Sequence, residues 1–318
     1  MPIPIAYWST RKSSAAIDAF LKRPAFDPAA EGVAATVLAD IRARGDAAVL
    51  AAAERFDGVV LKPSDMRLTA TQLAAASREV TPTVRRAVRE AHRRVTAFAK
   101  AGLRKDWQLT TRHGGRLGER FLPLDRVGVY IPGCAAPLAS TAIMTATLAR
   151  VAGVREIVAC TPCGRDRSVN PVLLHALRVA GATEVYRVGG IQAIGLMAFG
   201  TASVRPVQKI VGPGGAFVTA AKRQVYGHVA LDLVAGPSEI AVLADKTAKP
   251  GWVAADLLSQ LEHGTGHERA LLVTDSAELA QEVSDQIAWQ TPRLGRAARI
   301  APMLEKGLLL VVVPTLDQ

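Results

Sequence analysis

Three polar side chains lie close together where an apolar helical pattern ends, in the stretch "DLLSQLEHGTGHERALLVTD" at residues 256–275. Gln260 and His263 are three residues apart in an unbroken helical pattern, so their side chains are neighbours on one helix face. An amide oxygen and a neutral imidazole can supply half of an open, catalytic-type zinc site, but two ligands are fewer than such a site needs. The alternative is a histidine with a structural role.

A metallohydrolase motif is a second interpretation of this stretch. His263 and His267 are four residues apart, but Gly264 and Gly266 between them should break the helix that would place both on one face. Glu262 also precedes both histidines instead of lying between them. The sequence therefore disfavours a metal site built on two histidines of one helix.

Glycines and cysteines mark two further stretches. "GPGGAF" (212–217) connects a β-rich run to a helical one, so its backbone N–H groups could hold an anion at a helix N-terminus. It lacks the last glycine of the fingerprint G-x-G-x-x-G, and a tight turn that needs a positive φ is the alternative. Cys160 and Cys163 have the C-x-x-C spacing of a redox pair or of half a zinc site, but no second pair completes a zinc site, and a redox pair normally opens a helix instead of following a strand. We expect packed cysteines at a strand end.

The composition favours a soluble α/β protein. Of the 318 residues, 49% are hydrophobic and only 5% aromatic, which suits short buried strands covered by helices. Three cysteines and no signal peptide in "MPIPIAYWSTRKSS" predict a reducing, cytoplasmic setting. The longest apolar run, at 307–314, is too short to cross a bilayer, so we expect no membrane partner.

The formal net charge of +11 raises the question of an anionic partner. The basic residues are nevertheless spread along the chain, and the densest run, at 84–105, has apolar residues at helical spacing. Its arginines are therefore most simply the solvated face of a helix. No recognisable nucleic-acid module accompanies the charge, so we expect no nucleic-acid partner.

The elements that must position these residues alternate regularly after about residue 126. Short β-rich runs at 127–133, 155–161, 184–190, 208–215, 239–245, 269–275 and 308–313 are separated by helical runs. This alternation predicts parallel, doubly wound sheets and an α/β fold with a helical N-terminal region. We expect an N-terminal arm at 1–24, one discontinuous lobe at 25–127 plus 237–318, and a second lobe inserted at 128–236.

Several stretches, taken in this order, closely resemble histidinol dehydrogenase. They are "RVGVYIPG", "VAGVREIVACTPC", "YRVGGIQAIGLMAFGT", "QKIVGPGGAFVTAAKRQVYGHVALDLVAGPSEIAVLAD" and "VAADLLSQLEHG". The resemblance implies two incomplete Rossmann-like lobes and a homodimer intertwined through small terminal domains. It also implies oxidation of L-histidinol to L-histidine, through an aldehyde, in two NAD-dependent steps that use one zinc.

The resemblance also assigns roles to particular positions. Tyr130 and Gln192 match NAD contacts, and Gly215 occupies the third such position, where the family has an asparagine in G-P-G-N. Ser238 matches a substrate-contacting serine. Gln260 and His263 match the first two zinc ligands, which also hold the substrate. We expect Tyr130, Gln192, Gly214 and Ser238 to line one cavity facing Gln260 and His263.

The resemblance further implies that part of the family's site lies beyond the position matching Gln318. There the family has a Glu-His pair for acid–base work, then an aspartate and a partner-subunit histidine that complete the zinc shell. No catalytic residue is therefore assigned within this sequence, and we expect a shortened chain with an incomplete zinc site and impaired activity. Two alternatives are a catalytically dead relative that serves in binding or assembly, and a dehydrogenase of another small alcohol.

Overall fold

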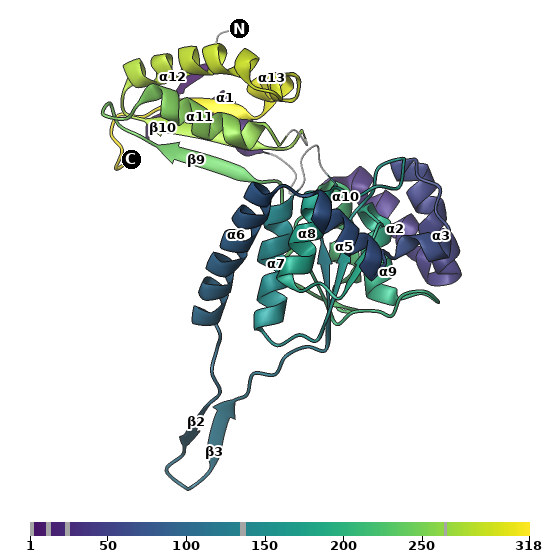
Figure 1. The fold of residues 1–318 in the computed structure, drawn as a ribbon. Coiled ribbons are helices and arrows are strands. Elements are labelled where there is room, and N and C mark those ends of the chain that lie inside the picture. Colours follow the sequence, from purple (N-terminus) through teal and green to yellow (C-terminus); the bar gives the residue numbers. More distant parts are fainter. Residues whose placement is uncertain (1–2, 11–13, 23–25, 134–137, 264–265) are drawn as a thin grey trace. The chain divides into compact units, whose positions relative to one another are not determined.

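The computed structural model describes residues 3–10, 14–22, 26–133, 138–263 and 266–318. Two compact units make up the chain, one formed by residues 26–234 and the other by residues 1–25 and 235–318. Each is built on an all-parallel sheet (Figure 1). Within the described residues, no helix is both long enough and apolar enough to cross a membrane.

The larger unit has a five-stranded sheet in the order β6-β5-β4-β7-β8. Its strands are β4 (Arg126–Tyr130), β5 (Glu156–Cys160), β6 (Glu184–Tyr186), β7 (Lys209–Val211) and β8 (Ala230–Leu231). The helices that connect them are α7 (Ala139–Val151), α8 (Pro171–Ala180), α9 (Gly190–Phe199) and α10 (Ala216–Val225). Sequential strands run outward from β4 to β6, and the chain then returns to add β7 and β8 on the other side of β4. The sheet therefore has its topological switch point between β4 and β7.

Helices cover both faces of this sheet, because successive strand side chains point to opposite faces. On one face, Tyr130, Val158 and Ile210 pack with α9, α10 and α2 (Pro28–Arg44). On the other, Val129, Ile157 and Val185 pack with α7, α8, α5 (Ala70–Glu79) and α6 (Pro82–Ala101). Shorter elements complete the unit: α3 (Asp46–Ala52), the π-helical turn Ala53–Asp57, α4 (Pro63–Met66) and the hairpin β2 (Trp107–Thr110) and β3 (Arg116–Glu119).

The smaller unit has a four-stranded sheet in the order β1-β11-β10-β9. Its strands are β1 (Ile5–Tyr7), β9 (Glu239–Leu243), β10 (Arg269–Thr274) and β11 (Leu308–Val312). One face packs against α11 (Pro250–Leu261), α12 (Ala277–Gln290) and α13 (Ala297–Lys306), with a 3-10 turn at Thr291–Arg293. The other face packs against α1 (Ala15–Leu21).

The α/β fold with parallel sheets is confirmed, and every β-rich run expected from the sequence contains a strand. The division of the chain differs from the expected lobes. Residues 26–125 belong with the five-stranded sheet, because α2 packs into the same apolar core as α9 and α10. The expected arm is instead part of the smaller unit, where β1 pairs with β11.

Candidate functional site

Tyr130 lies at the centre of the carboxyl edge of the five-stranded sheet. It is the last residue of β4, and its ring is buried in the core. Its hydroxyl accepts a hydrogen bond of 3.1 Å from the N–H of Gly190, the first residue of α9. Its backbone oxygen lies so close to Gly212 that a Cβ added there would be only 2.2 Å away. Tyr130 therefore contacts the turns that follow two other strands.

Gln192 lies in the first turn of α9 and is almost completely buried. Its Nε2 donates to Asp57 Oδ2 at 2.8 Å. Burial raises the pKa of the Asp57 carboxyl above its ordinary value, although the hydrogen bond from Gln192 opposes that shift. The carboxylate and the amide orient each other, which fixes the Gln192 side chain beside the N-terminus of α9.

The glycine-rich turn at residues 212–215 needs glycine at two of its positions. Gly212 has φ +120° and touches the Tyr130 backbone, and a Cβ on Gly214 would lie 2.2 Å from a Val218 methyl carbon. Gly215 is different, since its φ is −72° and an added Cβ would meet nothing within 4 Å. Gly212 therefore meets the requirement of a tight turn, whereas Gly215 stands in open space at the N-cap of α10. Free N–H groups at such a helix start can bind an anion.

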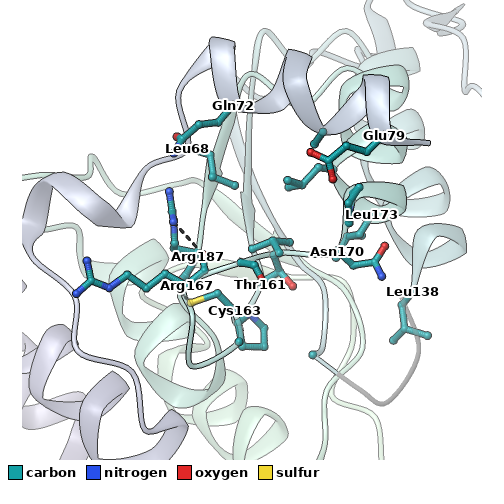
Figure 2. A pocket seen from close by; sticks show the side chains of 18 of the residues that line it. Leu68, Gln72, Glu79, Leu138, Thr161, Cys163, Arg167, Asn170, Leu173 and Arg187 are labelled. Carbon is teal, nitrogen blue, oxygen red and sulfur yellow. Dashed lines mark hydrogen bonds between the residues drawn. The ribbon is translucent and has the colours of Figure 1, made fainter.

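A cavity of about 970 Å³ opens at the carboxyl ends of β4, β5 and β6 (Figure 2). Its floor includes Thr161 and Cys163 after β5 and Arg187 after β6, while Gln72 and Glu79 of α5 face it from above. Within the described part of the chain, Thr161 Oγ1 is buried with no hydrogen-bond partner. Asp57 also lines this cavity and thereby connects it to Gln192. The sequence reasoning missed this cavity; the available signal was the polar residue that directly follows β5 and β6, Thr161 and Arg187.

The cysteine pair is not suited to redox or metal chemistry. Cys160 is fully buried in β5, which raises the pKa of its thiol to about 12. Burial likewise raises the pKa of the Cys163 thiol, despite the nearby charge of Arg187. Both shifts disfavour the thiolate that such chemistry needs. The expectation of a packed cysteine at a strand end is confirmed for Cys160.

The remaining candidate residues belong to the smaller unit. Ser238 is exposed and directly precedes β9, and its backbone oxygen accepts from the N–H of Arg269 at 3.4 Å. Gln260 lies at the end of α11 and His263 in the turn that follows. Gly264, one of the two glycines expected to break the helix after His263, lies outside the described residues. Because the two groups of candidates fall in different units, the single cavity expected for all of them remains a prediction.

Gln260 and His263 have properties that suit metal ligands. His263 Nδ1 lies 3.1 Å from the Gln260 backbone carbonyl, which can only accept, so the ring that makes this hydrogen bond carries a proton on Nδ1 and, in its neutral form, has its lone pair on Nε2. Gln260 Nε2 is buried without a partner among the described residues. Amide nitrogen and oxygen are distinguished only by hydrogen bonding, so this position can equally present the oxygen that zinc would bind.

These two donors do not complete a zinc site. The described residues contain no group of three or more His, Cys, Asp or Glu side chains arranged to hold a metal ion. A catalytic zinc normally keeps about three protein ligands. The pair therefore fits as part of a zinc site and not as a complete one.

Comparison with known proteins identifies the family. A family model described as histidinol dehydrogenase matches residues 22–318. The chain is 42% identical over 286 residues to histidinol dehydrogenase of Rhizobium meliloti, covering 90% of this chain and 65% of that protein. It is 44% identical over 292 residues to the enzyme of Moorella thermoacetica, covering 91% of this chain and 69% of that protein.

A solved structure agrees with these matches. Histidinol dehydrogenase from Elizabethkingia anophelis superposes with a TM-score of 0.88 at 31% identity, covering 99% of this chain and 72% of that one. The chain thus spans about two thirds of the length of the curated relatives it matches. The match extends through both units and includes the carboxyl-edge turns around Tyr130 and the end of α11. The chain belongs to the histidinol dehydrogenase family.

Proposed function

We propose that this chain forms part of an NAD-dependent enzyme that oxidises L-histidinol to L-histidine through the aldehyde. The observation that supports the proposal is that Tyr130, at the switch point of the larger unit, contacts both turns that lead to the other two positions matching NAD contacts in the family. Tyr130 touches Gly190 at the start of the helix bearing Gln192, and it also touches the glycine-rich turn that leads to Gly215. Open α/β sheets bind their ligands at this edge.

In this proposal the larger unit binds NAD. The unpaired N–H groups at the start of α10 face an anionic group such as the pyrophosphate, because the positive end of a helix dipole favours negative charge. The Gln192 amide, held by Asp57, is oriented to hydrogen-bond the dinucleotide. Gly215 adds no side chain, so it leaves room for the ligand at the cost of the hydrogen bond that the family's asparagine makes.

In the smaller unit, Ser238, Gln260 and His263 bind the substrate in our proposal, and the latter two contribute to the zinc shell. The metal, when bound, polarises the amino and imidazole nitrogens of histidinol. The tautomer of His263, with its proton on Nδ1, supports this role because Nε2 is the available donor. The acid–base pair is assigned to the portion of the family that follows the position of Gln318.

We also propose a homodimer located in the cytoplasm, with a small-molecule substrate and no nucleic-acid or membrane partner. The family resemblance supports the dimer, and histidine biosynthesis, as a pathway of soluble metabolites, supports the location.

The test is NADH formation by the purified full-length protein with L-histidinol, NAD and zinc, followed by absorbance. Two NADH per histidinol and rescue of a histidine auxotroph are the results expected. Binding of NAD and histidinol without turnover would favour a catalytically dead relative instead. Faster turnover of another small amino alcohol would overturn the substrate assignment while keeping the dehydrogenase chemistry.

A further inference from the structure

One partly buried ion pair holds both backbone polar groups of Gly212. Asp232 Oδ2 accepts from the Gly212 N–H at 2.8 Å, and Lys222 Nζ donates to the Gly212 carbonyl at 2.9 Å. The ammonium also donates to Asp232 Oδ1 at 2.5 Å, and the Leu233 N–H donates to the same oxygen at 2.8 Å. The pair thus closes a ring around the first residue of the glycine-rich turn.

Burying the Lys222 ammonium costs free energy, which argues that the pair has a role beyond stability. Lys222 is only 5% exposed, whereas the side chain of Asp232 is 28% exposed. Burial alone would raise the pKa of the Asp232 carboxyl, yet Lys222 and the N–H groups of Gly212 and Leu233 outweigh burial and lower it. Buried ion pairs often add less stability than well-packed apolar residues would. Apolar side chains in place of Lys222 and Asp232, however, could not hold the Gly212 backbone in position through hydrogen bonds.

The residues of the pair come from the two elements that follow the turn. Lys222 lies in the second turn of α10, and Asp232 directly follows β8. Gly212 itself directly follows β7 and packs against the Tyr130 backbone at the end of β4. The pair therefore holds the turn at the switch point, where the chain leaves β7 and enters the helix that we propose binds NAD.

We infer that Lys222 and Asp232 are positioning residues for dinucleotide binding, acting by fixing Gly212 so that the start of α10 faces the ligand. This inference rests on the proposed function, because it presumes that NAD binds at this turn. Neither side chain needs to touch the ligand. Both backbone groups of Gly212 are already occupied by the pair, so the donors left for NAD come from the residues that follow it.

A second buried ion pair in the same sheet provides a matched control. Arg126 at the start of β4 donates to Glu184 at the start of β6 at 2.7 Å, and both side chains are largely buried. These residues lie at the amino edge of the strands, the end opposite Tyr130. Glu184→Gln should therefore cost stability without moving the glycine-rich turn.

The experiment measures the NAD dissociation constant by calorimetry and the melting temperature for five proteins. They are the unaltered full-length protein, Lys222→Met, Asp232→Asn, the double variant Lys222→Met with Asp232→Leu, and Glu184→Gln. The double variant guards against misfolding, since replacing both partners leaves no unpaired buried charge. We expect every variant of the pair, including the double variant, to bind NAD about tenfold or more weakly, because small misplacements of binding groups are costly.

The double variant and Glu184→Gln should both melt lower than the unaltered protein, because the former leaves the Gly212 backbone groups unpaired. Only the double variant should bind NAD weakly, whereas Glu184→Gln should bind NAD within about twofold of the unaltered protein. A purely structural pair would give the opposite pattern, with NAD affinity following melting temperature across all five proteins. That pattern, or unchanged affinity in the double variant, would overturn the inference alone. Failure of the unaltered protein to bind NAD would overturn the proposed cofactor and this inference together.

Discussion

Replacing Gly215 by asparagine should both stabilise the larger unit and tighten NAD binding. The backbone at this residue has φ −72° and ψ −176°, which any L-residue adopts, and an added Cβ meets nothing within 4 Å. The substitution therefore introduces no strain. Asparagine at an N-cap is favoured over glycine by a few tenths of a kcal/mol, and removing a glycine from the unfolded chain contributes about 0.4–1 kcal/mol.

Together these effects amount to about 1 kcal/mol, which corresponds to a rise in melting temperature of roughly 2–4 °C for a unit of this size. One added hydrogen bond to NAD is worth about 0.5–1.5 kcal/mol, or about twofold to tenfold in the dissociation constant. Asparagine can serve both roles at once, because its oxygen can cap α10 while its amide N–H groups remain for the ligand.

The assay combines thermal melting with calorimetric titration of NAD, and Gly215→Ala is the control. Alanine gains the same reduction in unfolded-chain entropy, but it is a poor N-cap and offers no hydrogen bond, so both measured values should stay near those of the unaltered protein. A lower melting temperature for Gly215→Asn would refute our account of the local backbone. Equal NAD affinity for the asparagine and alanine variants would refute the placement of this residue beside the dinucleotide.

Three further outcomes are expected. Burial and nearby arginines lower the pKa of His175, so the stability that this residue contributes should be fully present above about pH 6.5. Below that pH the free energy of unfolding should fall by at most about 1.4 kcal/mol per pH unit. The melting temperature of His175→Leu should therefore decrease less than that of the unaltered protein between pH 7.5 and 5.5. Gly214→Ala should cost about 1–3 kcal/mol and weaken NAD binding, because its Cβ would collide with Val218, and a melting temperature equal to that of the unaltered protein would contradict this. A polypeptide of residues 1–318 should retain less than one zinc per chain after dialysis, as measured by metal analysis, because Gln260 and His263 supply only two neutral ligands. One tightly held zinc per chain would instead mean that other side chains complete the site.

The alternating pattern of strands and helices could be predicted from the sequence because most of the strands are short apolar runs closed by glycine or proline. The run at 127–133 contains β4, which ends before Pro132, a residue without the N–H that a central strand needs. Elements that depend on distant partners were missed. Strand β1 is three residues long and is defined by its pairing with β11, and helix α13 contains Pro302, which argues locally against a helix.

The assignment of the N-terminal helices to the five-stranded sheet could not be predicted from periodicity. An amphipathic helix shows that it covers an apolar surface, but not which one. Here the choice is made by side-chain fit, since Ile41 and Leu38 of α2 pack so closely over Gly195 in α9 that a Cβ there would be 2.7 Å from Ile41. Such a fit between helices separated by about 150 residues leaves no periodic trace in the sequence.

Prediction from the sequence has the same limit for single side chains of the candidate site. Tyr130, Gln192 and Gly215 were found through the resemblance, whereas Lys222 in "AAKRQV" has the pattern of a solvated helix face. Only the fold shows that its ammonium is buried against Asp232 and the Gly212 carbonyl. A lysine at the surface contributes little, while the same lysine in a closed hydrogen-bonded ring can set the position of a turn. Candidate binding residues can therefore be proposed from a resemblance in sequence, whereas residues that hold a turn in place become visible only when distant segments of the chain are seen in contact.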